Sequence, residues 1–353
     1  MNKNIILAVE ALGMISSMAD TAEGNAALMR CHYDGFGVSN YLQPFSPEPQ
    51  IVAEINQYKN IGGLDLLMRL SVDAVKDIKD QCPDLSLNNV PIIVCLPSLE
   101  RFASYSYEGF ESDYFSRLLS TLKVDSQHPG SSYVFGGRTG IIHMLKHAQT
   151  LVNNDSCKQV LLIIADSYLN SDSFSYFSGD IYNNGRRLIG DEFSNGFVPG
   201  EAAVAVLLGN PGTSFTQTCI TGLGLGEEPS IIGSGEVLRA DGLSEAIRQA
   251  SASSATPVCE TDFRISSANG EEYWFREASL AQSRTLEKKR PSHPLWHPAD
   301  SIGEVGAAVG GAMIVMAHYA FEKGYAPGSA ALCQISNDNS ERGAFILERV
   351  EAV

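Results

Sequence analysis

The chain has 353 residues, of which 44% are hydrophobic and 19% charged, an ordinary composition for a globular protein. Its formal net charge of −16 repels phosphate backbones and anionic membranes, so we expect neither nucleic acid nor a membrane as a partner. The seven cysteines are scattered without metal-ligand spacing, which favours reduced thiols and predicts no metal site. The first apolar run is short and reads as a strand, not an export signal, so we expect a cytoplasmic protein.

Short apolar runs typical of buried strands alternate with helical patterns along the whole chain. In the first part they predict a strand at 5–9, a helix at 62–79, a strand at 90–96, a helix at 115–122, a strand at 133–135, a helix at 136–151 and strands at 160–165 and 201–208. The second part predicts a strand at 219–222, a helix at 242–250, a strand at 262–266, a helix at 273–286, a helix at 303–321 and strands at 330–335 and 343–348. Such alternation indicates an α/β protein with buried sheets.

The two parts of the chain are similar to each other. Each has a glycine-bearing loop that opens a buried helix, at 136–151 and at 303–321, and each ends on an apolar strand. This predicts a duplicated α/β unit with halves 1–212 and 213–353. The first half contains 167–199, a segment rich in Ser, Tyr, Asn, Asp and Gly, and such long excursions usually carry function or form an interface.

The stretch from Ser301 to Ala312 contains four glycines and three alanines, although each internal glycine costs a helix about 1 kcal/mol relative to Ala. It is also apolar on all sides, which is typical of a helix enclosed by protein. The small residues therefore predict a helix packed very close to a neighbouring element. A loop at the N-terminus of such a helix is also a favoured place for an anionic or reacting group.

Four motifs, in this order, resemble those of the β-ketoacyl synthases of the thiolase superfamily. They are the turn Gly137-Arg138-Thr139-Gly140, which is similar to the nucleophile elbow, the strand start Pro199-Gly200-Glu201-Ala202-Ala203, the loop Ala268-Asn269-Gly270 with Glu277 after it, and Ser301-Ile302-Gly303-Glu304 followed by Gly306-Ala307-Ala308 and Gly310. The resemblance implies the thiolase fold, with two duplicated α/β halves in a five-layer αβαβα arrangement. The family is characteristically dimeric.

The chain departs from this family at the positions that carry its chemistry. There, an elbow cysteine takes up the acyl chain, and two histidines, or His and Asn, assist decarboxylation and hold the enolate oxygen. The elbow position holds Gly137 here, or Arg138 if the register shifts by one, and Asn269 and Glu304 stand at the two histidine positions. The upstream lysine is replaced by Pro298-Ala299. We therefore expect no standard Cys-His-His condensing activity.

The resemblance implies that further residues border an acyl chain. These are Phe135, Thr139, Gly303 and Asn337, the last in the segment 336–340 that replaces the glycine-rich closing loop of the family.

The sequence allows two interpretations for several residues near the motifs. His293 and His297 lie just upstream of the Glu304 loop and are candidates to replace a lost histidine, or they are ordinary loop residues. Glu304 either caps the following helix or acts as a general base. Arg138 either forms a surface salt bridge or holds an anion.

Three functions are compatible with the sequence. The first is a ketosynthase-like pseudo-enzyme of fatty-acid or polyketide type that binds a partner or an acyl group. The second is an active acyltransferase that condenses acyl-ACP or acyl-CoA with displaced residues, and the third is a purely structural interaction protein. The resemblance implies a homodimer or a heterodimer with a ketosynthase-like subunit, and an acyl carrier protein as a further partner. We expect no cofactor, with acyl-CoA or a phosphopantetheine-borne acyl chain as the ligand.

Overall fold

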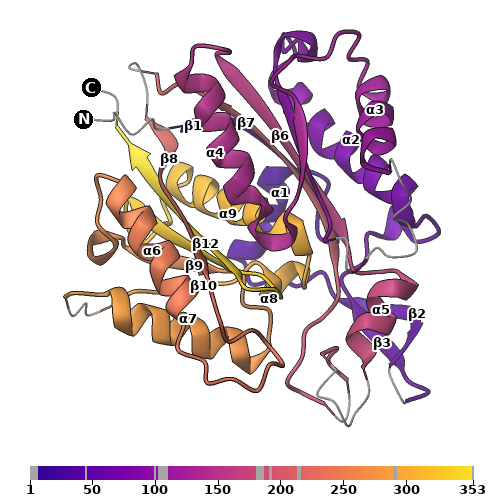
Figure 1. Ribbon diagram of the computed structural model, residues 1–353. Helices are drawn as coiled ribbons and strands as arrows, with labels where there is room; N and C mark the ends of the chain where they lie inside the picture. Colours follow the sequence, from indigo (N-terminus) through magenta and orange to yellow (C-terminus); the bar gives the residue numbers. More distant parts are fainter. Residues whose placement is uncertain are drawn as a thin grey trace.

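The computed structural model describes residues 7–43, 46–98, 101, 110–179, 187–190, 193–212, 216–288 and 292–351. Ten strands of this part form one mixed sheet in the order β10-β9-β11-β12-β8-β1-β7-β6-β4-β5, while β2 and β3 pair separately (Figure 1). No helix within these ranges combines the length and the apolar character needed to cross a membrane.

The ten-stranded sheet is built from two halves with the same order of elements. The first half contains β1 (Leu7–Ser16), α2 (Gly63–Gln81), β4 (Ile92–Leu96), α3 (Phe110–Thr121), β5 (Ser132–Phe135), α4 (Gly140–Asn153), β6 (Gln159–Ser167) and β7 (Glu201–Gly209). The second contains β8 (Gln217–Glu227), α6 (Asp241–Ser253), β9 (Phe263–Ser266), α7 (Glu272–Thr285), β10 (Leu295–Trp296), α9 (Val309–Glu322), β11 (Ala330–Ser336) and β12 (Glu341–Val350).

Strand directions repeat between the halves as well. In the first, β5, β4 and β6 are parallel and β7 and β1 follow antiparallel; in the second, β10, β9 and β11 are parallel and β12 and β8 follow antiparallel. The predicted duplication is therefore confirmed. The division proposed at residue 212 lies in the connection between β7 and β8, where it stays a prediction.

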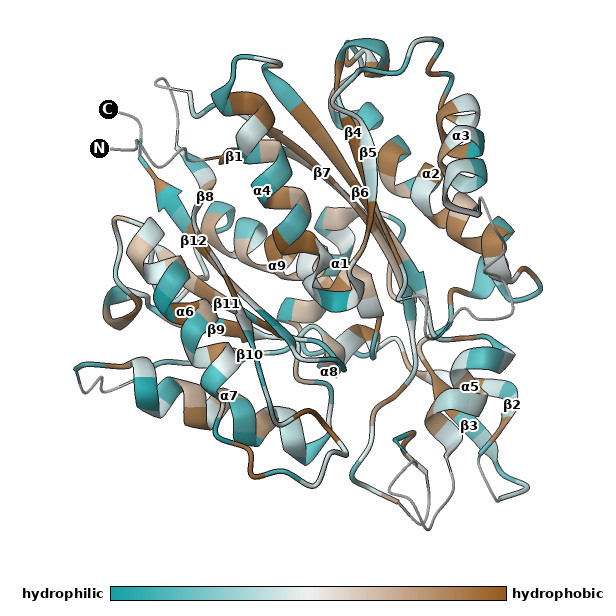
Figure 2. Cartoon of the chain, viewed as in Figure 1, coloured by the Kyte–Doolittle hydropathy of each residue, from teal (hydrophilic) through white to brown (hydrophobic). Residues whose placement is uncertain are grey.

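The helices form three layers around the two halves of the sheet. One apolar core joins α2 and α3 to the outer face of the first half, and another joins α6 and α7 to the outer face of the second. The largest core surrounds α4 and α9, which lie between the halves and pack against strands of both (Figure 1). Figure 2 shows the hydrophobic colour concentrated on the strands β6 and β7, whereas α6 and α7 carry polar residues outward. The arrangement is the expected five-layer αβαβα fold.

The glycine- and alanine-rich stretch forms the start of the middle layer. A Cβ atom on Gly310 would lie 2.4 Å from Ile141 of α4, and one on Gly311 would lie 2.7 Å from Val204 of β7. The predicted close packing is thus confirmed, but the predicted helix start at Gly303 is wrong. Gly303 and Gly306 have φ of +68° and +53°, so the chain turns there and α9 begins only at Val309.

Some elements differ from the sequence prediction. The strand β1 was predicted to end at residue 9 but continues to Ser16. The exposed Glu10 lies at a bulge between Val9 and Ala11, after which the pairing with β7 resumes. Elements that the sequence did not predict are α1 (Ala22–Arg30), β2 (Gly37–Leu42), β3 (Pro49–Val52), α5 (Ser171–Ser178), the two-residue β10 and the short α8 (Ala299–Ile302). The helix α5 lies within the excursion 167–199, where Asn170 caps it by accepting a hydrogen bond from the Ser173 N–H.

Candidate functional site

Two tight turns at equivalent places in the halves meet at the centre of the molecule. The turn Gly137–Thr139 connects β5 to α4, and the turn Gly306–Ala308 leads into α9. Gly137 has φ of +50° and Gly306 has φ of +53°, a left-handed conformation that strains any residue with a Cβ. A Cβ on Gly137 would also lie 3.0 Å from Oδ1 of Asn337. The elbow is therefore shaped for glycine.

Arg138, directly after the elbow glycine, is 2% exposed and points into the junction between the halves. Its Nη1 donates to Asp338 at 3.1 Å and to the Ser336 carbonyl at 3.2 Å. Its Nη2 lies 2.8 Å from Oε2 of Glu304, as an ion pair without hydrogen-bond alignment. The expectation of a surface salt bridge is wrong, because both acidic partners come from the second half and hold the guanidinium inside.

Glu304 connects the two histidine-equivalent positions. Its Oε2 accepts a 2.6 Å hydrogen bond from the Asn269 amide, and its Oε1 accepts a 2.8 Å bond from the Gly306 N–H. The structure therefore brings Asn269 and Glu304 together beside the elbow, as the resemblance implied. The bond to Gly306 fixes the turn before α9, but the helix itself begins after Ala308 without a side-chain cap, so the prediction that Glu304 caps this helix is wrong.

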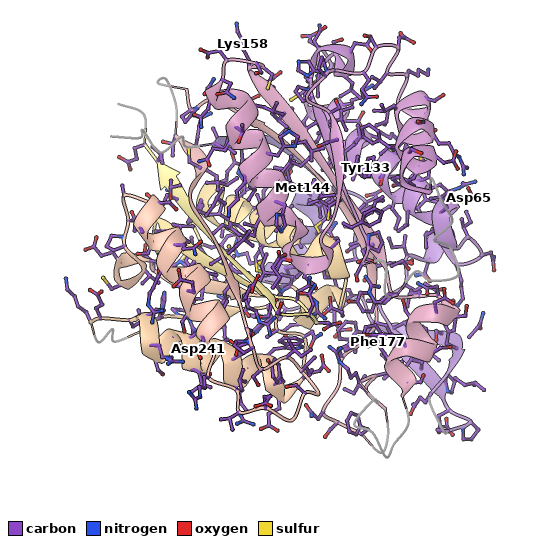
Figure 3. All side chains as sticks on the ribbon, in the orientation of Figure 1. Asp65, Tyr133, Met144, Lys158, Phe177 and Asp241 are labelled. Atoms are coloured by element: carbon purple, nitrogen blue, oxygen red, sulfur yellow. The ribbon has the colours of Figure 1, made fainter. Side chains whose placement is uncertain are left out.

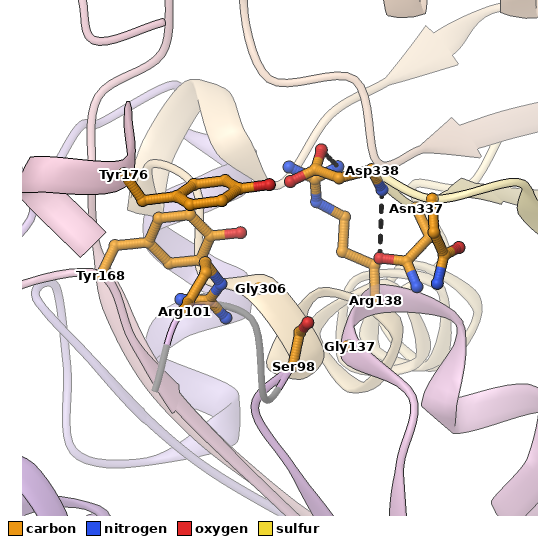
Figure 4. Close-up of a pocket in the computed structure, with 10 residues that line it drawn as sticks. Ser98, Arg101, Gly137, Arg138, Tyr168, Tyr176, Gly306, Asn337 and Asp338 are labelled. Atoms are coloured by element: carbon orange, nitrogen blue, oxygen red, sulfur yellow. Dashed lines mark hydrogen bonds and ion pairs between the residues drawn. The ribbon is translucent and has the colours of Figure 1, made fainter. Parts of the chain in front are cut away.

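Asp338 is a central residue that the sequence did not single out. It accepts hydrogen bonds from Arg138 at 3.1 Å and from Arg187 at 2.9 Å, and Arg187 also bonds Glu271 at 2.6 Å (Figure 4 shows Asp338 and Arg138). Burial alone would raise the pKa of Asp338, but the positive charges of Arg138 and Arg187 hold it well below its usual value. The carboxylate is ionised throughout the physiological pH range.

A further ion pair lies beside Gly306. Arg101 Nη2 is 2.5 Å from Oδ2 of the fully buried Asp166, which also accepts a 2.8 Å bond from the Ala307 N–H. The Arg101 guanidinium stacks over the Tyr168 ring, 3.8 Å from its centroid (Figure 4). We call these charged side chains the ion-paired centre: Arg101, Arg138, Arg187, Asp166, Glu271, Glu304 and Asp338.

The free space inside this centre is very small. The cavity bordered by Gly137, Arg138, Tyr168 and Asp338 has a volume of about 10 Å³, which is about enough for one water molecule. Among the residues that the structure describes, this cavity of the ion-paired centre therefore has room for about one water molecule.

No family model matches the sequence, and no curated protein matches it. Solved structures, in contrast, match over almost the whole chain. A ketosynthase in complex with its chain length factor from Xenorhabdus doucetiae aligns with a TM-score of 0.73 and 12% identity, covering 99% of both chains. The chain has the ketosynthase fold.

Two other structures give the same result. A type II polyketide synthase acyl-carrier protein in complex with its ketosynthase bound to the hexaketide aligns with a TM-score of 0.78 and 11% identity, covering 98% of this chain and 100% of that one. The ketosynthase from module 6 of the bacillaene synthase of Bacillus subtilis 168 aligns with a TM-score of 0.74 and 12% identity, covering 98% of this chain and 72% of that one. At such low identity, the similarity shows the fold alone.

The residues expected to border an acyl chain in this ketosynthase fold have other contacts. Asn337 donates to the Gly136 carbonyl at 3.0 Å, and Thr139 donates to the same oxygen at 3.0 Å. Gly303 adopts a positive φ beside Val198, whose carbonyl oxygen would be 2.6 Å from an added Cβ. Phe135 is partly buried and packs edge-on against Tyr133. Three of these four residues thus shape the backbone of the centre.

The two candidate histidines are not part of the ion-paired centre. His293 Nε2 lies 3.1 Å from the Thr261 hydroxyl. His297 Nδ1 lies 3.4 Å from Asp300, and its ring packs edge-on against Phe275. The nearest imidazole to the elbow is that of His143, which is bonded to Glu341 at 2.9 Å.

A thiol does lie beneath the elbow, but it is inert. Cys95 Sγ is 4.0 Å from the Gly137 carbonyl oxygen and is completely buried. Burial raises its pKa to about 12, so it stays protonated at neutral pH and is a poor nucleophile. Across the described ranges, no group of three or more His, Cys, Asp or Glu side chains could hold a metal ion.

Proposed function

We propose that this chain is a ketosynthase-like subunit of fatty-acid or polyketide type that lacks the standard condensing activity and acts by binding a ketosynthase-like partner. The observation that carries the proposal is the ion-paired centre. Charged side chains fill the space around Gly137, where the resemblance places the acylated cysteine, and leave about 10 Å³ free. An acyl thioester needs far more room than one water molecule.

The chemistry of the centre also opposes condensation. Gly137 supplies no nucleophile, and the carboxylates of Glu304 and Asp338 would repel the oxyanion that develops on an enolate. The Asn269 amide, which could donate to such an oxyanion, already donates to Glu304. This amide donor is thus already engaged by a protein carboxylate.

Partner binding is supported by the neighbouring structures and by the sheet edge. Solved neighbours include a ketosynthase with its chain length factor and a ketosynthase with an acyl-carrier protein. In the described part of the sheet, β5 pairs on one side only, with β4, so its other edge is open to a strand of another chain. We propose a heterodimer with a ketosynthase-like subunit, with an acyl chain carried on a carrier protein or CoA as the ligand of the assembly.

The test of the missing activity is intact-protein mass spectrometry after incubation with acyl-CoA and acyl-carrier protein. Cys31 is exposed, so the measurements use a Cys31→Ser background to prevent unspecific acylation. We expect no acyl adduct on this protein, and none when Gly137→Cys is added, because the new thiol would enter a filled centre beside carboxylates. An active ketosynthase is the positive control. An adduct on Gly137→Cys would show that the centre admits acyl donors, and one on the Cys31→Ser protein would overturn the loss of activity.

The test of partner binding is co-expression with ketosynthase-like proteins from the same organism, followed by native mass spectrometry. We expect a one-to-one complex. The substitution Tyr133→Glu, which places a charge at an exposed position of β5, should disrupt this complex. Failure of every such protein to bind would contradict the partner half of the proposal and leave the acylation result intact.

A further inference from the structure

A second cavity, of about 160 Å³, lies between the end of α1, β10, α8 and α9. It shares no lining residue with the cavity at the ion-paired centre. Its volume is close to that of a protein cavity that accommodates one benzene ring. The space is therefore suited to a single small ring.

Aromatic and thioether side chains form the walls of this cavity. The rings of Trp296 and Tyr325 have centroids 6.4 Å apart and planes inclined by 30°. Met29 and Met316, which are 5% and 8% exposed, complete the apolar lining. Ring faces and thioether sulfur atoms are favourable neighbours for a planar aromatic ligand.

Three polar groups of the lining that lack partners among the described residues are hydrogen-bond donors, beside the unpartnered His297 Nε2. The Arg30 guanidinium lies over the Tyr325 ring, 4.4 Å from its centroid, and pairs with no carboxylate of the residues that the structure describes. Neither the Trp296 N–H nor the Tyr325 hydroxyl donates to any of those residues. Burial raises the pKa of Tyr325, so its hydroxyl remains a donor at neutral pH. The carboxylate at the rim, Asp300, already lies 3.4 Å from His297.

A cation and two neutral donors around an apolar slot are complementary to one kind of ligand, a flat ring that carries an anionic acceptor. We propose that this cavity binds a small aromatic carboxylate, with its ring against Trp296 and Tyr325 and its carboxylate at Arg30. This binding site goes beyond the proposed function and does not depend on it.

The test uses 4-fluorobenzoate as the probe and fluorine NMR of the full-length protein. We expect line broadening that corresponds to a Kd of about 1 mM or tighter, which is reasonable for so small a ligand. The neutral analogue 4-fluorobenzamide should bind about tenfold more weakly, because it cannot form the charge-assisted bond to Arg30. Equal binding of the two probes, or no binding of either, would overturn the proposal.

Two variants locate the binding. Arg30→Gln should weaken 4-fluorobenzoate binding about tenfold, whereas Arg248→Gln, at an exposed arginine on α6, should leave it unchanged. Met316→Phe should abolish binding of both probes, since the larger side chain fills the slot. If Arg30→Gln and Arg248→Gln behave alike, the carboxylate does not bind at Arg30 and the assignment is wrong.

Discussion

Arg138 shows how the fold holds a charged side chain in its interior. Its guanidinium is 2% exposed and faces two carboxylates, Glu304 and Asp338, which are 2% and 18% exposed. Removing one member of a buried pair leaves the other charges without compensation, which costs about 3–5 kcal/mol of folding free energy. Exposed pairs contribute much less, at about 0–1 kcal/mol. The contribution of an ion pair to the folding free energy therefore depends on whether the pair is buried or exposed.

We therefore expect Arg138→Met to lower the free energy of unfolding by about 3–5 kcal/mol in urea denaturation. The double variant Arg138→Met, Glu304→Gln should recover part of this loss, because one of the two stranded carboxylates is then neutral. The matched control is Arg117→Met, which breaks the exposed pair with Asp65 and should cost less than about 1 kcal/mol. Similar losses for Arg138→Met and Arg117→Met would contradict a buried, compensated pair.

At this scale, the sequence identified the positions of the centre but not their partners. Gly137, Asn269 and Glu304 were found because they stand in motifs with a fixed order. Asp338 is 200 residues away from its partner Arg138, and Arg187 is 84 residues away from its partner Glu271. Only the fold brings these pairs together. One usable signal did exist, since Asp166 directly follows the apolar run 160–165, where a charged residue requires a buried partner.

Among the elements, the start of β7 is held by a buried carboxylate. Glu201 accepts 2.9 Å bonds from the Ile55 N–H and from the hydroxyl of Ser167, at the end of β6. Burial raises the pKa of Glu201 from 4.5 to about 7. The folded protein thus keeps a proton on Glu201 that the unfolded chain has already lost between these pH values. The free energy of unfolding consequently falls as pH rises from 4.5 to 7 and is then level with respect to this group.

Glu201→Gln should remove this contribution while keeping the size of the side chain and one oxygen that can accept the Ile55 N–H bond. We expect the melting temperature of the variant, relative to that of the natural protein, to rise between pH 5 and pH 8. Glu245→Gln, at an exposed position on α6, serves as the control and should show no such trend. If the difference in melting temperature between Glu201→Gln and the natural protein stays constant with pH, the pKa of Glu201 is not raised.

Elements with a continuous or periodic apolar pattern were predicted well, and elements without such a pattern were missed. Fully buried strands such as β6 and β7 have continuous apolar runs, and α2 has an amphipathic pattern, so their types were clear. By contrast, β10 has only two residues in a proline-rich segment, and its pairing with β9 depends on the tertiary fold. The helix α5 is composed mainly of Ser, Phe, Tyr and Asp, which have weak helix propensity, so packing decides its structure.

At the scale of the whole molecule, the duplicated halves share one interior. The middle-layer core contains residues of both halves, β1 pairs with β8, and Arg138 forms ion pairs across the junction. These shared contacts mean that neither half can bury its inner face without the other. The sequence indicated the duplication through its two glycine-led helices, whereas the ion pairs across the junction depend on their packing.

We therefore expect one cooperative unfolding transition. The two tryptophans, Trp274 and Trp296, both lie in the second half, so their fluorescence reports on that half, while far-UV circular dichroism reports on the whole chain. The two signals should give the same urea midpoint and slope. Separate midpoints would show that the halves unfold independently.

The glycine at the elbow has a consequence for protein engineering. Its φ of +50° is a conformation that tolerates a side chain only under strain. A cysteine introduced at this single position would stand among paired arginines and carboxylates that neither leave it space nor favour a second negative charge. Building a thiol site at the elbow would therefore require coordinated changes in both halves of the chain.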